Sequence, residues 1–148
     1  MCVAQGMSNH LNDLITVCLD GVHGYKQAAE HANDASLKSL LSDYANQRQS
    51  FATELQGLVR AAGGTPTDSG SVTAAFHRGW IGLKDQLTSG DKGIFGECIR
   101  GAEHAQKQYA KALGDDDVPA QAKTVLATQH GQVEQALAQM NTLHRQAS

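Results

Sequence analysis

Four stretches of this sequence place apolar residues every three to four positions, and this spacing constrains the fold more than any other feature. Side chains at that interval return to one face of an α-helix, so each stretch predicts a helix with one buried face. The stretches cover residues 8–32, 34–62, 91–113 and 118–145. The two prolines, Pro66 and Pro119, lie outside or at the edge of these stretches, as expected because proline breaks a helix interior.

A long segment rich in Gly, Ser and Thr separates the second stretch from the third. Gly63 and Gly64 are a left-handed stop signal for the second helix, and a shorter helix is predicted over 71–87. The other connections are short, which makes the helices that they join antiparallel neighbours. The long segment can instead run the length of a bundle. We therefore predict an all-α four-helix bundle with one crossover, built by residues 8–148 as a single domain after a flexible extension over 1–7.

The composition supports this fold and excludes several classes of partner. Hydrophobic residues make up 41% of the chain but aromatic residues only 5%, which favours closely packed helices with small side chains. The 12 basic residues are scattered in a chain of net charge −3, so a nucleic-acid partner is not expected. No apolar run approaches the roughly 20 residues that span a bilayer, so we expect no membrane partner.

The cysteines and the N-terminus indicate the compartment. The chain has 3 cysteines without any Cys-x-x-Cys spacing, which indicates neither a disulfide framework nor a zinc site. The first residues lack the basic and apolar regions of a signal peptide. We therefore expect a reducing, cytoplasmic setting.

Several motifs along the chain resemble one known family. They are Leu11-Asn12-Asp13-Leu14-Ile15, Asp20-Gly21, Gly24-Tyr25, Ala28-Ala29-Glu30, Gly63-Gly64-x-Pro66-x-Asp68-Ser69-Gly70-Ser71, His77-Arg78-Gly79-Trp80, Glu97 and Gly101-Ala102-Glu103 with Tyr109. The sequence resembles the bacterial four-helix-bundle family of unknown function within the ferritin-like superfamily. The resemblance covers nearly the whole chain from Met7. It implies a ferritin-like fold, a bacterial cytoplasmic protein and no assigned activity.

The metal ligands of a ferritin-like di-iron centre are missing from the sequence. Such a centre takes a Glu from each of two helices and a Glu-x-x-His pair from each of the other two, and no Glu-x-x-His occurs here. The apolar stripe of the second helix instead carries Arg48, which cannot bind a cation. We therefore expect no metal or cofactor. The alternative is a single Fe, Mn or Zn ion on Glu103 and His130.

A buried arginine must be paired and hydrogen-bonded. We predict a polar network in the middle of the bundle, in which Arg48 pairs with Glu103. The stripes also place an amide and three hydroxyl groups there. The predicted members are Arg48, Glu103, Gln129, Tyr25, Tyr44 and Tyr109.

The crossover motif His77-Arg78-Gly79-Trp80 has two interpretations. The simpler one is that His77, Arg78 and Trp80 anchor the crossover to the bundle, with Gly79 allowing a close approach. The other is a histidine phosphotransfer module, since such modules are also four-helix bundles with one reactive histidine. They typically carry Lys-Gly at the third and fourth positions after that histidine, and the residues after His77 do not match this spacing.

These patterns predict a non-enzymatic bundle that acts by association, as a homodimer, in a bacterial housekeeping or stress role. One alternative is a ferritin-like metal-binding protein or oxidoreductase with a degenerate site. A second alternative is the phosphotransfer module that uses His77.

Overall fold

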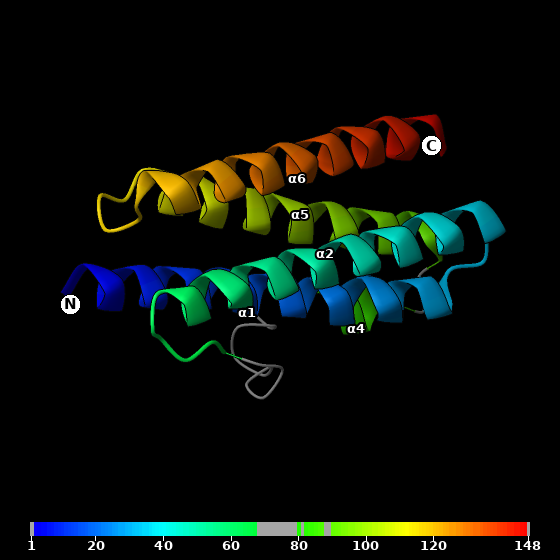
Figure 1. Cartoon of the computed structure of the whole chain (residues 1–148). Helices are drawn as coiled ribbons and strands as arrows, with labels where there is room; N and C mark the ends of the chain where they lie inside the picture. Colours follow the sequence, from blue (N-terminus) through cyan, green and yellow to red (C-terminus); the bar gives the residue numbers. More distant parts are fainter. Residues whose placement is uncertain (1, 68–79, 81, 88–89, 148) are drawn as a thin grey trace.

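The computed structural model describes residues 2–67, 80, 82–87 and 90–147 of the chain, and it is helical as predicted (Figure 1). Four long helices lie side by side, and a single short helix of the crossover is described beside them. The helices are α1 (Cys2–His31), α2 (Ala35–Ala61), α4 (Leu83–Gln86), α5 (Asp91–Leu113) and α6 (Ala120–Ala147). No helix among the described residues is long and apolar enough to cross a membrane.

The helices form two antiparallel pairs, α1 with α2 and α5 with α6 (Figure 1). The pairs meet mainly through α1 and α5, whereas α2 and α6 approach each other at few points. The end of α2 and the start of α5 lie at opposite ends of the bundle, so the connection between them spans its length. This arrangement confirms the predicted bundle with one long crossover.

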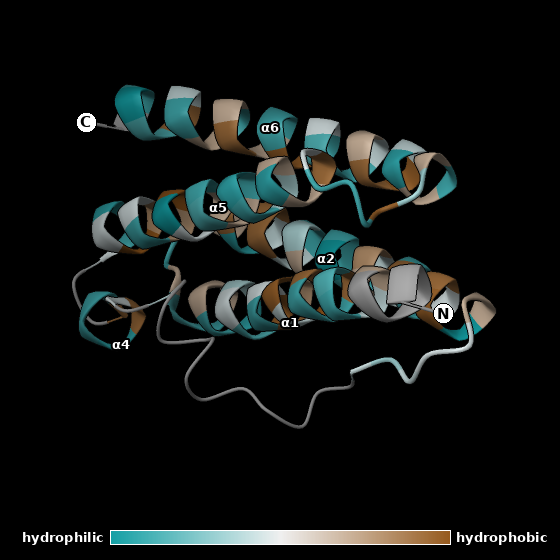
Figure 2. Ribbon diagram, turned by 90° about the vertical axis from the view of Figure 1, so that its left-hand side faces the viewer, coloured by the Kyte–Doolittle hydropathy of each residue, from teal (hydrophilic) through white to brown (hydrophobic). Residues whose placement is uncertain are grey.

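The core lies between the four long helices, whose apolar faces point inward (Figure 2). Most of its side chains are small or aliphatic, as the composition indicates. One cluster fills the half of the bundle that holds the start of α1, and it includes Leu11, Leu55, Val118 and Leu126. A second cluster fills the other half around Tyr25, Trp80, Ile94 and Met140.

Local signals in the sequence set the helix ends. Asp34 caps α2, because its carboxylate accepts a hydrogen bond from the backbone N–H of Ser36 at 3.2 Å. Gly63 has a φ of 83° and ends α2 in the left-handed conformation that glycine favours. The chain then returns onto α1, where Asn12 donates to the Thr65 carbonyl at 3.1 Å and accepts from the Thr67 N–H at 2.7 Å. Asn12 therefore holds the start of the crossover in place.

Two predicted boundaries need correction. The extension over 1–7 was expected to be flexible, but α1 begins at Cys2 and Met7 is buried in the core. The apolar stripe continues to Met7, which lies in the same core cluster as Leu11. Of the crossover helix predicted over 71–87, the described residues include a helix only at Leu83–Gln86, and residues 68–79 and 81 lie outside them.

Candidate functional site

The centre of the bundle holds the side chain of Arg48, which projects inward from the middle of α2. Arg48 is only 2% exposed and is among the largest fully buried side chains of the protein. Its guanidinium lies over the ring of Tyr25, with 5.4 Å between the guanidinium carbon and the ring centroid. A cation above an aromatic face gains roughly 2 kcal/mol when both groups are desolvated. Tyr25 therefore offsets part of the cost of burying this charge.

The predicted pairing of Arg48 with Glu103 does not occur, because Glu103 is exposed. Ala102 takes the buried position on that turn of α5, and the next residue is rotated about 100° around the helix axis. Among the described residues, no carboxylate lies within ion-pair distance of Arg48. In the part of the chain that the structure describes, its Nη2 atom and the hydroxyl of Tyr25 are buried without a hydrogen-bond partner. The centre of the bundle is thus a desolvated cation with incomplete hydrogen bonding.

Next to Arg48, a chain of hydrogen bonds leads from the core to the surface. The Tyr109 hydroxyl contacts the Cys18 sulfur at 3.2 Å and donates to the Gln129 carbonyl oxygen at 2.6 Å. The amide nitrogen of Gln129 donates to the Glu54 carboxylate at 2.7 Å. Two predicted members of the polar network, Tyr109 and Gln129, are therefore joined. Glu54, rather than Glu103, supplies the acid.

Glu54 opens onto a polar groove between α2 and α6. Amide and hydroxyl side chains line this groove, and Glu54 is its charged member. The lining residues are Asn46, Gln49, Ser50, Thr53, Glu54, Thr128 and Gln132. Tyr44, also predicted for the network, lies further along the same seam and donates its hydroxyl proton to Gln139. Tyr44 thus forms its hydrogen bond in the α2–α6 seam, while its ring packs against Tyr25, with ring centroids 5.6 Å apart.

Burial keeps the thiols and phenols of this region protonated. Desolvation raises the pKa of Cys18, although Arg48 and the hydrogen bond with Tyr109 oppose the shift. Desolvation also raises the pKa of Cys98, Tyr25 and Tyr109. Since the thiolate is the reactive form of cysteine, neither buried thiol is poised as a nucleophile.

Trp80 anchors the crossover between α1 and α5. It is 3% exposed and meets Tyr25 edge to face, with ring centroids 5.0 Å apart. Two glycines make room for the indole, because a Cβ would come within 2.5 Å of it at Gly24 and within 2.6 Å at Gly101. The other residues of the predicted anchor, His77, Arg78 and Gly79, lie outside the described residues. The phosphotransfer interpretation of His77 stays a prediction.

A buried acid holds the crossover just after Trp80. Glu97 is 3% exposed, and its carboxylate accepts a hydrogen bond from the Gly82 N–H at 2.7 Å. The same carboxylate accepts from the Arg100 guanidinium at 3.3 Å. Glu97 thus fixes the approach of α4 to α5.

An interior iron centre, which a ferritin-like fold implies, does not fit these residues. Arg48 fills the middle of the bundle, and the described residues contain no interior set of three metal-ligating side chains. His130, one of the two candidate ligands, is half-buried, with its Nδ1 atom 3.6 Å from the Glu134 carboxylate. No such set of three includes His130 or the exposed Glu103.

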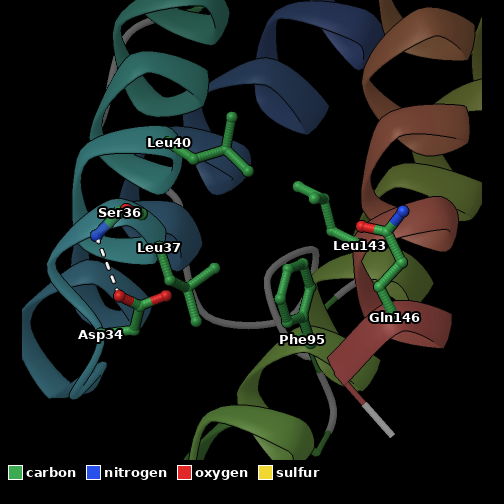
Figure 3. A pocket seen from close by; sticks show the side chains of 7 residues that line it. All are labelled: Asp34, Ser36, Leu37, Leu40, Phe95, Leu143 and Gln146. Carbon is green, nitrogen blue, oxygen red and sulfur yellow. Dashed lines mark hydrogen bonds between the residues drawn. The ribbon is translucent and has the colours of Figure 1, made fainter.

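The far end of the bundle has a small apolar pocket between α2, α5 and α6 (Figure 3). Its volume is about 300 Å³, at the lower end of the range for small-molecule sites. Leu37, Leu40, Phe95 and Leu143 form the walls, and Asp34 is the charged residue at its edge. The Asp34 carboxylate already caps α2, so this pocket offers little polar chemistry for fixing a ligand.

Sequence patterns missed two residues of this site, Gly21 and Glu54. Gly21 was not recognised as the neighbour of Arg48, although a glycine inside a helix often marks a close packing contact. Glu54 was missed because it lies beside the apolar stripe and not within it.

The bundle of four long helices, its long crossover and its buried polar centre define a ferritin-like helical bundle. In agreement, the structure is similar to that of Dps from Microbacterium arborescens in the high iron form, with a TM-score of 0.77 and 17% sequence identity. The similarity covers 99% of this chain and 95% of that chain. At this identity the likeness shows the fold alone.

The chain belongs to the family of the domain of unknown function DUF2383, whose model matches residues 6–115. No curated protein matches the sequence.

Proposed function

We propose that this chain is a non-enzymatic ferritin-like bundle that acts by association, as a cytoplasmic homodimer, and that a polar network replaces a di-iron centre in its interior. The observation that carries the proposal is the buried Arg48. It projects into the middle of the bundle, where facing helices of this fold class bring their metal ligands together.

The electrostatic argument is quantitative. Two unit charges 4 Å apart repel by about 4 kcal/mol at an effective dielectric constant of 20, so a guanidinium and a divalent ion repel by about 8 kcal/mol. Carboxylate ligands overcome such a repulsion in metal centres. Here the acid nearest to the network, Glu54, lies at the surface and accepts a hydrogen bond from Gln129. Asp20 and Glu97 are buried acids, but among the described residues no interior set of three metal-ligating side chains is present to offset the repulsion.

The second candidate function is iron binding or oxidation in a degenerate site. What favours it is the similarity of the fold to a Dps that is described in its high iron form. The two candidates differ in one place, the candidate metal ligands Glu103 and His130. The proposal requires that no ion binds there, whereas the alternative requires one.

The deciding experiment is metal analysis of the protein, purified and then incubated with ferrous iron. Any iron, manganese or zinc that the wild type holds should also be held by the Glu103→Ala and His130→Ala variants. The wild type should not accelerate the oxidation of ferrous iron. Stoichiometric metal that disappears in either variant would overturn the proposal. Gln108→Ala is the matched control, since Gln108 is a partly exposed residue of α5 outside these contacts.

Association is tested separately by light scattering of the purified chain. The proposed homodimer has a mass twice the 15.7 kDa of one chain. A monomer at micromolar concentration would contradict the association part of the proposal and leave the interior argument unchanged.

A further inference from the structure

A second polar cluster lies at the end of the bundle that holds both the start of α1 and the turn between α5 and α6 (Figure 1). The Nε2 atom of His10 is 2.9 Å from a carboxylate oxygen of Asp115 and 4.0 Å from one of Asp117. One ligand atom from each residue lies within 4.8 Å of the other two. We propose that His10, Asp115 and Asp117 form a binding site for a divalent transition-metal ion, outside the bundle interior.

The spacing of the three atoms suits a common metal ion. Nitrogen and oxygen ligands bind zinc at roughly 2.0–2.2 Å. Two ligand atoms at that distance are about 3 Å apart at a right angle and about 4 Å apart when they face each other across the metal. The two separations measured from His10 fall within this range. One ion can therefore contact all three groups after small side-chain rotations.

The backbone around the cluster is fixed before any ion binds. The second oxygen of Asp115 accepts a hydrogen bond from the Asp117 N–H at 2.8 Å, which shapes the turn and leaves the first oxygen facing His10. Leu11, next to His10, and Val118, next to Asp117, are buried in the same core cluster. Two segments about a hundred residues apart in sequence are thus held together by packing, which lowers the entropic cost of binding.

The charge of the cluster also favours a cation. With a neutral imidazole, the two carboxylates bring two negative charges close together, and no Lys or Arg of the described residues forms an ion pair with them. A divalent ion neutralises that charge. One imidazole nitrogen with two carboxylate oxygens suits Zn²⁺, Mn²⁺ or Fe²⁺ better than Ca²⁺ or Mg²⁺, which prefer oxygen ligands alone.

The site lies far enough from Arg48 for the charge repulsion to be weak. His10 precedes Gly21, the contact of Arg48 on α1, by eleven positions, which is about 16 Å along a helix. Because Coulomb repulsion falls in inverse proportion to distance, the repulsion at about 16 Å is about a quarter of that at about 4 Å. Metal binding at the turn is therefore compatible with an interior that excludes metal.

The test is a calorimetric titration of the full, chelator-treated chain with Zn²⁺, using two variants of the same turn. Asp117→Asn removes a proposed ligand, whereas Asp116→Asn removes the same charge from an exposed neighbour outside the cluster. We expect Asp117→Asn and His10→Ala to weaken binding by roughly tenfold or more. Asp116→Asn should change it less than threefold, and circular dichroism should show all the variants folded.

Two results would overturn the proposal. One is the absence of stoichiometric binding by the wild type, which would leave His10 and Asp115 as a simple ion pair. The other is equal weakening by Asp117→Asn and Asp116→Asn, which would indicate a diffuse acidic surface. Metal that is lost on Asp117→Asn but kept on Glu103→Ala supports this site without affecting the proposed function. Metal that is kept on Asp117→Asn but lost on Glu103→Ala contradicts both proposals.

Discussion

Arg48 packs directly onto Gly21 of α1, so that a Cβ at position 21 would lie 2.7 Å from its Nη1 atom and 3.1 Å from its Cγ. The guanidinium occupies the middle of the bundle because α1 has no side chain at this turn. The burial of the Arg48 charge therefore depends on the absence of a Cβ at position 21.

This arrangement predicts that Gly21→Ala destabilises the protein. Alanine is normally better than glycine inside a helix by about 0.5–1 kcal/mol, but here the methyl group displaces the Arg48 side chain. We expect a net loss of about 1–3 kcal/mol in the free energy of unfolding, measured by urea denaturation. The loss should shrink in an Arg48→Met background, where the shorter, more flexible chain can move aside. Equal losses in both backgrounds would show that the two residues are not coupled.

The indole of Trp80 predicts a stronger effect at its two glycines. A Cβ at Gly24 or Gly101 meets a rigid ring rather than the end of a flexible side chain. Each Gly→Ala variant should cost about 3 kcal/mol and shift the tryptophan fluorescence toward that of an exposed indole. Gly57→Ala is the control, because nothing lies within 4 Å of its Cβ position. That variant should gain about 0.5–1 kcal/mol, and a loss there would question the packing argument.

Tyr109 and Tyr44 allow a matched comparison of hydrogen bonds. Tyr109→Phe leaves the buried carbonyl oxygen of Gln129 without its 2.6 Å donor, which should cost about 1–3 kcal/mol. Tyr44→Phe affects Gln139, which is exposed and can bond to water instead, so that its cost should stay below about 1 kcal/mol. Thermal denaturation of the two variants measures the difference. Similar losses would mean that the buried hydrogen bond of Tyr109 stabilises the fold no more than the exposed one of Tyr44.

The buried thiols and phenols predict a loss of stability in alkali. Burial raises the pKa of Cys18, Cys98, Tyr25 and Tyr109 above their ordinary values of 9.0 and 10.0, and it raises that of Tyr44 to about 12. Above pH 9 the folded state then holds more protons than the unfolded state, so the free energy of unfolding falls as pH rises. Urea denaturation at pH 8 and pH 10.5 should show this fall, and a constant midpoint would contradict it.

The reactivity of the cysteines is an independent test of their burial. Cys18 and Cys98 are free thiols with no exposed surface, and their raised pKa keeps the reactive thiolate scarce. At pH 8 both should resist a thiol-labelling reagent until urea unfolds the chain. Rapid labelling of either residue in the native protein would show that the core opens readily.

The helices and their order could be predicted from the sequence because the signals are local. The apolar periodicity gives the four long helices, and Asp34 and Gly63 give the ends around α2. Arg48 could be placed in the interior because it lies on the apolar stripe of α2, and that stripe faces the core. These features depend only on residues within a few turns of one another.

The partners of the polar residues could not be predicted, because they depend on packing between helices. Glu103 lies one residue from the buried face of α5, and a rotation of about 100° separates a core ligand from an exposed acid. The link of Glu54 to Gln129 and the meeting of His10 with Asp115 each join distant segments. Only the assembled bundle shows which side chains meet.

The central claim, that a guanidinium takes the place of interior iron, is tested most directly by anomalous diffraction from crystals soaked in ferrous iron under anaerobic conditions. The account predicts no anomalous peak between the four long helices, with the Arg48 side chain in density over Tyr25. An iron peak in the interior, ligated by side chains such as Glu103 or His130, would contradict it.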